Sequence, residues 1–309
     1  MKAVCIYSYG GPGVLVYQEM PCPRPGPGEV LIRVHAAGIN PIDWKVREGH
    51  LQAMLHHTLP LVLGWDLSGQ VEIVGSGVLR LNVGDGVFSR PDTSRDGAYA
   101  EFIVVRETEV ALKPQSIDHV HAAALPLAGL AAWQALFDTA HLGAGQAVLI
   151  HAAAGSVGLL AVQLAKRTGA HVIAVSSARD HRLLRRLGAD EVVDYQAAPF
   201  EQVTGPVDVV LDTLGGDVQA RSWKLIKKGG ILVSLVDPPS AEIAASHGVR
   251  QAWVRSQPNA TQLAELAKLV DAGHLAATVG KILPLCDAAR GHQLGELGHT
   301  RGKIVLRVV

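Results

Sequence analysis

The sequence is poor in cysteine and in aromatic residues, and it has no excess of charge of either sign. Its 309 residues include three cysteines, and Phe, Trp and Tyr together make up 5%. The cysteines Cys5, Cys22 and Cys286 are far apart and form no CxxC pair. This scarcity excludes a disulfide framework and a cysteine-rich metal site, and it favours a reducing, cytoplasmic environment.

The charges are balanced, with 28 Lys and Arg residues against 28 Asp and Glu residues. Binding to nucleic acid needs an excess or a cluster of basic groups, so we expect no nucleic-acid partner. The amino terminus lacks the long apolar core of a signal peptide. Asp138 is the only formally charged residue between 119 and 165. Histidines, Pro126 and an LGAGQ turn interrupt that run, so we predict a buried segment of a soluble protein and no membrane span.

The chain is long for one hydrophobic core, and two different patterns of apolar residues divide it. Up to about Ser116, short apolar runs are separated by Gly and Pro, a pattern typical of an antiparallel β domain. After that point, apolar runs alternate with stretches of helical periodicity, which predicts a parallel sheet with crossover helices. One such helix is expected in TQLAELAKLVDAG, with Thr261 as its cap and Gly273 as its end. The sequence therefore predicts an α/β protein.

The stretch VLIHAAAGSVGLLAVQLAK, residues 148–166, runs from a predicted strand through a small-residue loop into an amphipathic helix. Ala153, Gly155 and Gly158 occupy the three positions of the G-x-G-x-x-G pattern. Ser156 and Val157 would begin the helix, whose terminal N–H groups can face a pyrophosphate. The pattern indicates a dinucleotide-binding loop, and the structural alternative is a tight turn without a ligand.

The next predicted strand, HVIAV, ends where an NAD-preferring site usually carries Asp or Glu for the ribose hydroxyl. Here Ser176 and Ser177 stand at that end, and Arg179 follows. Hydroxyls and a guanidinium can bind a 2′-phosphate, so we predict NADPH as the cofactor. A solvated basic helix face is the alternative interpretation of this segment.

These segments, together with AAGINPIDWKVREG, LGWDLSGQVEIVGSGV, GAYAEFIVV and GHTRGKIVL, resemble the medium-chain dehydrogenase/reductase superfamily, specifically its zinc-free quinone oxidoreductase branch. The resemblance covers nearly the whole chain. It implies a GroES-like, antiparallel β domain from residues 1–118 and 278–309, which binds the substrate. It also implies a Rossmann domain with a doubly wound parallel sheet from residues 119–277, and a cleft at the junction.

Zinc-dependent members of the superfamily carry a Cys and a His-Glu pair at two positions. In this sequence Asn40 stands at the first position, and Trp65 and Asp66 stand at the second. An amide and an indole are poor zinc ligands. We therefore predict no metal, and a hydride acceptor that is already electrophilic, such as a quinone or an α,β-unsaturated carbonyl.

The resemblance also assigns residues to the site. It places Asn40 and Asp43 beside the nicotinamide and the acceptor, with Asn40 as a donor to the developing oxyanion, and it puts Lys45 where relatives often carry Tyr. A loop-stabilising Asn40 and a solvated Lys45 are the alternatives. The resemblance implies further cofactor contacts from Tyr195, Leu214, Gly215, Ser234, Leu235 and Lys303.

The predicted function is a zinc-independent, NADPH-dependent reduction of quinones or enones by a homodimer that pairs through the edge RQAWVRS, residues 250–256. Two alternatives stay open from the sequence. One is an alcohol dehydrogenase with an unrecognised metal site. The other is a non-catalytic protein that binds or senses NADPH.

Overall fold

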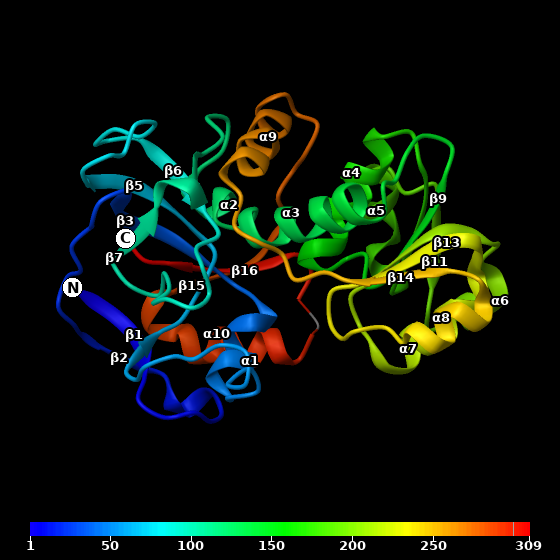
Figure 1. Ribbon diagram of the computed structural model, residues 1–309, viewed down its shortest axis with the longest axis horizontal. Helices are drawn as coiled ribbons and strands as arrows, with labels where there is room; N and C mark the ends of the chain where they lie inside the picture. The colour runs from blue at the N-terminus through cyan, green and yellow to red at the C-terminus, as the bar shows by residue number, and fades with distance from the viewer. Residues whose placement is uncertain (299) are drawn as a thin grey trace. The chain divides into compact units, whose positions relative to one another are not determined.

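The computed structural model describes residues 1–298 and 300–309, which form two compact units (Figure 1). The first unit comprises Met1–Leu130, Gln257–Gly273 and Ala277–Val309, and the second comprises Ala131–Ser256 and His274–Ala276. The predicted boundaries at 118/119 and 277/278 divide the chain differently. Residues 119–130 and 257–273 group with the first unit because their helices pack on its strands.

The first unit is built on two sheets. Strands β2, β1 and β4 form a three-stranded antiparallel sheet. A larger sheet has the order β15-β16-β3-β5-β6-β8, with β7 also paired to β3, and is antiparallel except for the β15–β16 pair. The strands are β1 (Lys2–Ile6), β2 (Val16–Glu19), β3 (Glu29–Ile39), β4 (Leu61–Val62), β5 (Leu67–Val74), β6 (Gly86–Ser89), β7 (Phe102–Arg106), β8 (Val110–Leu112), β15 (Val279–Pro284) and β16 (Lys303–Arg307).

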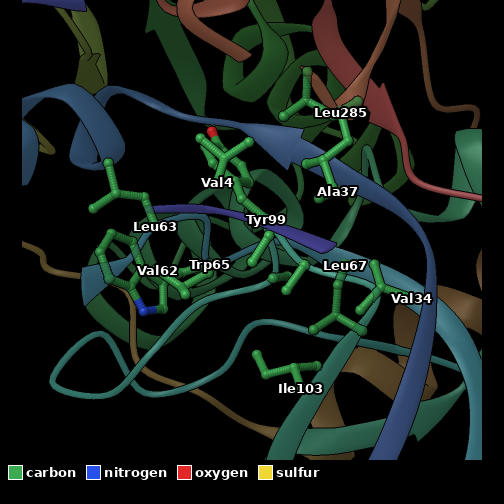
Figure 2. Close-up of a cluster of buried hydrophobic side chains, with 14 of the residues drawn as sticks. Val4, Val34, Ala37, Val62, Leu63, Trp65, Leu67, Tyr99, Ile103 and Leu285 are labelled. Atoms are coloured by element: carbon green, nitrogen blue, oxygen red, sulfur yellow. The ribbon is translucent and has the colours of Figure 1, made fainter. Parts of the chain in front are cut away.

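The core of this unit is formed by buried apolar side chains from both of its sheets. Figure 2 shows part of it, including Val4 of β1, Leu67 of β5, Leu285 and the buried rings of Trp65 and Tyr99. The helices of the unit are α1 (Pro41–Arg47), α2 (His119–Ala122), α9 (Ala260–Asp271) and α10 (Ala288–Glu296). The Asn259 side chain accepts a hydrogen bond from the Gln262 N–H and caps α9, so the predicted cap at Thr261 was wrong by two residues.

The second unit contains a six-stranded parallel sheet in the order β11-β10-β9-β12-β13-β14. Strand β9 (Ala147–Ile150) lies inside the sheet, and its last three residues are buried, as is typical of a parallel sheet with helices on both faces. The other strands are β10 (His171–Ser176), β11 (Glu191–Asp194), β12 (Val207–Asp212), β13 (Ile226–Ser234) and β14 (Arg250–Trp253). The helices are α4 (Ser156–Arg167), α5 (His181–Arg186), α6 (Phe200–Val203), α7 (Gly216–Ser222) and α8 (Ala241–His247). The predicted α/β class, with a parallel sheet and a mainly antiparallel β domain, is confirmed.

The nearly uncharged run is helical from His119 to Thr139 and is long and apolar enough to cross a membrane by length and composition alone. It consists of α2, α3 (Pro126–Trp133) and a π-helical turn, Gln134–Thr139. Its most apolar window is 72% buried inside the protein. Burial of this extent is what a core helix requires.

Candidate functional site

The loop between β9 and α4 turns sharply. Ala152 has a positive φ of 44°, and the Gly155 N–H closes the turn by donating to the Ala152 carbonyl at 2.9 Å. Ala153 is buried, and its N–H donates to the carbonyl of Val175 on β10 at 3.0 Å. The loop is thereby fixed to the carboxyl edge of the sheet before the helix begins.

Gly158 lets the first turn of α4 pack against this loop. A Cβ atom at Gly158 would lie 2.5 Å from the Ala152 carbonyl oxygen and 2.6 Å from the Ala153 Cα. The first main-chain bond of the helix runs from the Leu159 N–H to the Gly155 carbonyl. The N–H groups of Ser156, Val157 and Gly158 therefore precede the intrahelical bonds and are available for an anionic group. The loop fits the pyrophosphate of a dinucleotide.

The end of β10 carries the residues expected at a 2′-phosphate. Ser176 is buried, and its hydroxyl donates to the Ser177 carbonyl at 3.1 Å. Asp180, also buried, accepts from the Ser177 hydroxyl at 3.2 Å and from the Arg179 Nε at 3.3 Å. The Arg179 side chain is 58% exposed, so its guanidinium reaches solvent. A carboxylate therefore stands beside the two groups predicted to bind phosphate.

Strands β12 and β13 end side by side at the same edge of the sheet. Leu214 follows β12 with its side chain 52% exposed, and Gly215 has a positive φ of 71°. Ser234 at the end of β13 is fully buried, and the Leu235 N–H bonds to the carbonyl of Asp212 at 2.9 Å. Tyr195, after β11, is 56% exposed. The structure thus places the predicted cofactor residues of this unit at or beyond the carboxyl ends of its strands, where ligands bind parallel sheets.

In the first unit, Asn40 lies in a buried cluster with Asp66 and Lys303. The Asn40 Nδ2 donates to Asp66 Oδ2 at 3.1 Å and contacts the Gly38 carbonyl at 3.5 Å, while its Oδ1 accepts from the Lys303 ammonium. Lys303 also lies 2.9 Å from Asp66 Oδ2, and all three side chains are almost completely buried. The Leu127 N–H donates to the other Asp66 oxygen at 3.1 Å. Lys303, predicted to contact the cofactor, here neutralises Asp66 and holds Asn40.

Asp43 is the end of a second buried chain of hydrogen bonds. Its Oδ2 accepts from the Asn40 N–H at 2.7 Å and from the Tyr99 hydroxyl at 2.8 Å. Tyr99 in turn lies 3.2 Å from Nε2 of His292, and Arg47 donates to Nδ1 of that ring at 2.9 Å. Because Nδ1 accepts, Nε2 carries the ring proton and donates to Tyr99.

Burial controls the protonation of this chain. It raises the pKa of Asp43 from 3.8 to about 7, against the lowering effect of the hydrogen bonds from Asn40 and Tyr99. It lowers the pKa of His292 to about 3, with the nearby Arg47 charge acting in the same direction, so the ring is neutral. Asp43 Oδ1 is buried without a hydrogen-bond partner. The chain therefore holds a carboxyl that changes charge near neutral pH.

Gly64 permits the close approach of the Tyr99 ring. It has a positive φ of 94°, and a Cβ there would lie 2.2 Å from the Tyr99 Cδ1. Lys45, the third predicted catalytic residue, lies in the last turn of α1 and is partly exposed. The segment 40–45 therefore presents Lys45 toward solvent and turns Asn40 and Asp43 into the interior.

The positions that hold zinc in related dehydrogenases do not fit zinc here. The Trp65 indole is buried, and its N–H donates to the Arg95 carbonyl at 3.0 Å. The Asn40 oxygen faces the Lys303 ammonium, whose charge repels a cation. In residues 1–298 and 300–309, no group of three or more His, Cys, Asp or Glu side chains is arranged to hold a metal ion.

Sequence reasoning missed three residues of these clusters: Tyr99, His292 and Asp212. Each is fully buried and is bonded to a predicted site residue or to a residue that bonds one. Only Asp212 lies close in sequence to a residue that it holds. An aspartate immediately after an apolar strand, as in VDVVLD, is the signal that could have revealed Asp212.

Comparison with known proteins agrees with this arrangement. Residues 26–115 match the alcohol dehydrogenase GroES-like domain, and residues 187–306 match a family described as zinc-binding dehydrogenase. The chain is 34% identical to the mitochondrial NAD(P)H oxidoreductase RTN4IP1 of Bos taurus, over 100% of this chain and 89% of that protein.

Two solved structures have the same fold. The quinone oxidoreductase from Coxiella burnetii has a TM-score of 0.92 and 37% identity, with 100% of this chain and 99% of that chain covered. The Escherichia coli quinone oxidoreductase complexed with NADPH has a TM-score of 0.90 and 29% identity, with both chains covered completely. The protein is therefore an oxidoreductase and belongs to the quinone oxidoreductases of the medium-chain dehydrogenase/reductase superfamily.

Proposed function

We propose that this oxidoreductase uses NADPH in preference to NADH and reduces quinones or α,β-unsaturated carbonyls without zinc. The observation that carries the proposal is the strand–loop–helix from Ala147 to Arg167, whose free N–H groups precede the intrahelical bonds. The relatives named as NAD(P)H and quinone oxidoreductases support the same reaction class.

In this proposal, different residues of the second unit bind different parts of the cofactor. The N–H groups of Ser156, Val157 and Gly158 bind the pyrophosphate, and Ser177 and Arg179 bind the 2′-phosphate. The ends of β12 and β13 hold the nicotinamide half. When bound, the reduced nicotinamide supplies a hydride, and the acceptor takes up one further proton.

The residues predicted to serve the acceptor have different roles in this proposal. Lys45 is the partly exposed cation of the 40–45 segment and stabilises negative charge on the reduced acceptor. Asn40 and Asp43 are bonded internally and keep the segment in place. The oxyanion-donor role of Asn40 stays a prediction, and both of its amide hydrogens face internal acceptors in this structure.

The decisive experiment is the rate of NADPH oxidation with a panel of quinones, enones and alcohols, before and after treatment with a chelator. We expect turnover with quinones or enones that chelation leaves unchanged. Activity lost on chelation and restored by zinc would support the metal-dependent alternative. Tight NADPH binding without turnover on any acceptor would support the sensor alternative.

The edge of the parallel sheet supports the proposal of a homodimer. In the described part of the chain, β14 pairs only with β13, and Trp253 at its end is 36% exposed. An uncovered strand edge is a template for pairing with a second copy. Light scattering at micromolar concentration should give twice the chain mass, and a monomer would contradict this part of the proposal.

We keep the cytoplasm as the proposed location. Cys22 and Cys286 are exposed free thiols, which a reducing compartment keeps reduced. Fractionation of the source cells with an antibody to the protein tests the location. Recovery in the membrane or in an organelle fraction would contradict it.

A further inference from the structure

Asp212 is a fully buried carboxylate at the carboxyl end of β12, and no prediction from the sequence included it. Its Oδ1 accepts the N–H groups of Leu214 at 2.9 Å and Gly215 at 2.8 Å. Its Oδ2 accepts from Gln219 Nε2 and from the Ser234 hydroxyl, each at 2.9 Å. Four donors from three elements of the second unit therefore converge on one side chain.

The main chain of Asp212 extends this link to the neighbouring strand. Its carbonyl accepts the Leu235 N–H at 2.9 Å, and the Ser234 hydroxyl accepts the Val236 N–H at 3.2 Å. The chain after β12 turns at Gly215 and at Gly216, the first residue of α7, which both have positive φ. Asp212 thus fixes this turn to the end of β13, and the turn presents the exposed Leu214 side chain.

The strand order of the parallel sheet indicates which part of a dinucleotide would bind near this turn. From β9, one half of the sheet continues through β10 and β11, and the other half continues through β12, β13 and β14. A dinucleotide binds across such a switch point, with one mononucleotide at each half. The β9 loop and the end of β10 serve the pyrophosphate and the adenosine. The ends of β12 and β13 therefore face the nicotinamide half.

We propose that Asp212 is a positioning residue for the nicotinamide half of the cofactor. It acts through Leu214, Gly215 and Ser234 and does not itself touch the cofactor. This inference rests on the proposed NADPH binding. It predicts that loss of the Asp212 bonds weakens the contacts of the nicotinamide half and leaves those of the adenosine half intact.

The test is isothermal titration of the full-length protein with NADPH and with 2′,5′-ADP, a probe that lacks the nicotinamide half. Asp212→Ala should weaken NADPH binding by about tenfold or more, which corresponds to one lost contact of about 1.4 kcal/mol. The dissociation constant of 2′,5′-ADP should stay within about twofold of the wild-type value, because this probe lacks the nicotinamide half. A loss shared equally by both probes, or no loss for NADPH, would overturn the inference.

Two further variants separate positioning from general damage. Asp212→Asn keeps one oxygen for the two backbone N–H groups, while the Ser234 hydroxyl and the Gln219 amide can rotate to accept from its NH₂. It should therefore restore most of the NADPH affinity. Asp208→Ala is the matched control, because Asp208 lies at the opposite end of β12 and contacts Ala147 and Lys227. It should leave both affinities unchanged.

A milder variant covers the case in which Asp212→Ala does not fold. Gln219→Ala removes one of the four hydrogen bonds to the carboxylate. It should weaken NADPH binding by about threefold, which is part of the free energy of one hydrogen bond. The affinity for 2′,5′-ADP should not change. An unchanged NADPH affinity in this variant would count against the inference. If the wild-type protein bound neither probe, the proposed function itself would fail, which is a different result.

Discussion

The ammonium of Lys303 lies 2.9 Å from the carboxylate of Asp66, and both side chains are buried. The pair connects β16 near the carboxyl terminus to the segment before β5, and Asn40 bonds to both partners. Two opposite charges in a low-dielectric core stabilise each other only while both are present. The structure of the 40–45 segment therefore depends on a residue 263 positions away from Asn40.

Replacing Lys303 with Met should lower the free energy of unfolding by about 3 to 5 kcal/mol, because Asp66 would remain buried and unpaired. Denaturant unfolding followed by circular dichroism measures the change. The double variant Lys303→Met with Asp66→Asn should recover part of it. Lys281→Met, an exposed position on the neighbouring strand β15, is the control and should change stability by less than about 0.5 kcal/mol.

Asn40→Ala should act mainly on stability. The substitution removes the amide bonds to Asp66 and Lys303, so unfolding should become easier by about 1 to 3 kcal/mol. If the amide instead donates to the reacting oxygen, turnover should fall by about a hundred- to a thousandfold. We expect kcat to stay within about tenfold of the wild type, and measurement of both quantities on the same preparation separates the two roles.

The cofactor preference should depend on the balance between Arg179 and Asp180. Arg179→Ala should weaken NADPH binding by about ten- to a hundredfold, the value of one charge-assisted bond to phosphate, and should leave NADH nearly unchanged. Dissociation constants for both nucleotides measure the preference. Equal affinities for NADPH and NADH in the wild type would disprove the phosphate role of this segment.

Asp180→Asn should have the opposite effect. The Asp180 carboxylate lies 3.3 Å from the Arg179 Nε and 3.2 Å from the Ser177 hydroxyl, so it competes for the groups that would bind phosphate. Removing its charge should raise the ratio of NADPH to NADH affinity by about tenfold, the equivalent of about 1.4 kcal/mol. A lower ratio would show that Asp180 supports Arg179 rather than competing with a phosphate.

Asp43 should make folding depend on pH in a direction unusual for a carboxyl group. Burial raises its pKa from 3.8 to about 7, so between these values the folded chain keeps a proton that the unfolded chain releases. This contribution to stability is complete below about pH 4 and is lost, by about 1.4 kcal/mol per pH unit, as the pH rises toward 7.

The variant Asp43→Asn isolates this contribution, because it keeps an oxygen for Asn40 and Tyr99 and cannot ionise. Urea unfolding of both proteins from pH 5 to pH 8 measures the difference in their free energies of unfolding. The wild type should lose stability relative to the variant as the pH rises to about 7, and the difference should then level off. A difference that is constant over the whole range would exclude a raised pKa for Asp43.

The sequence by itself determined the features that depend on local spacing. The strand, the small-residue loop and the helix follow one another directly in the sequence between residues 147 and 167. Their apolar periodicity and the glycine positions therefore identify them directly. The same is true of the serines at the end of β10, which follow an apolar strand.

Only the tertiary structure decided which side chains share a buried site. Lys303 meets Asn40, and His292 meets Tyr99 across 193 positions, because the folded chain brings distant segments together and buried polar groups must find partners there. No local pattern encodes such a pairing. The sequence left Asn40 as either an oxyanion donor or a loop-stabilising residue, and only the structure shows that its amide bonds to Asp66. Asp212 was missed although its four hydrogen bonds fix the turn after β12.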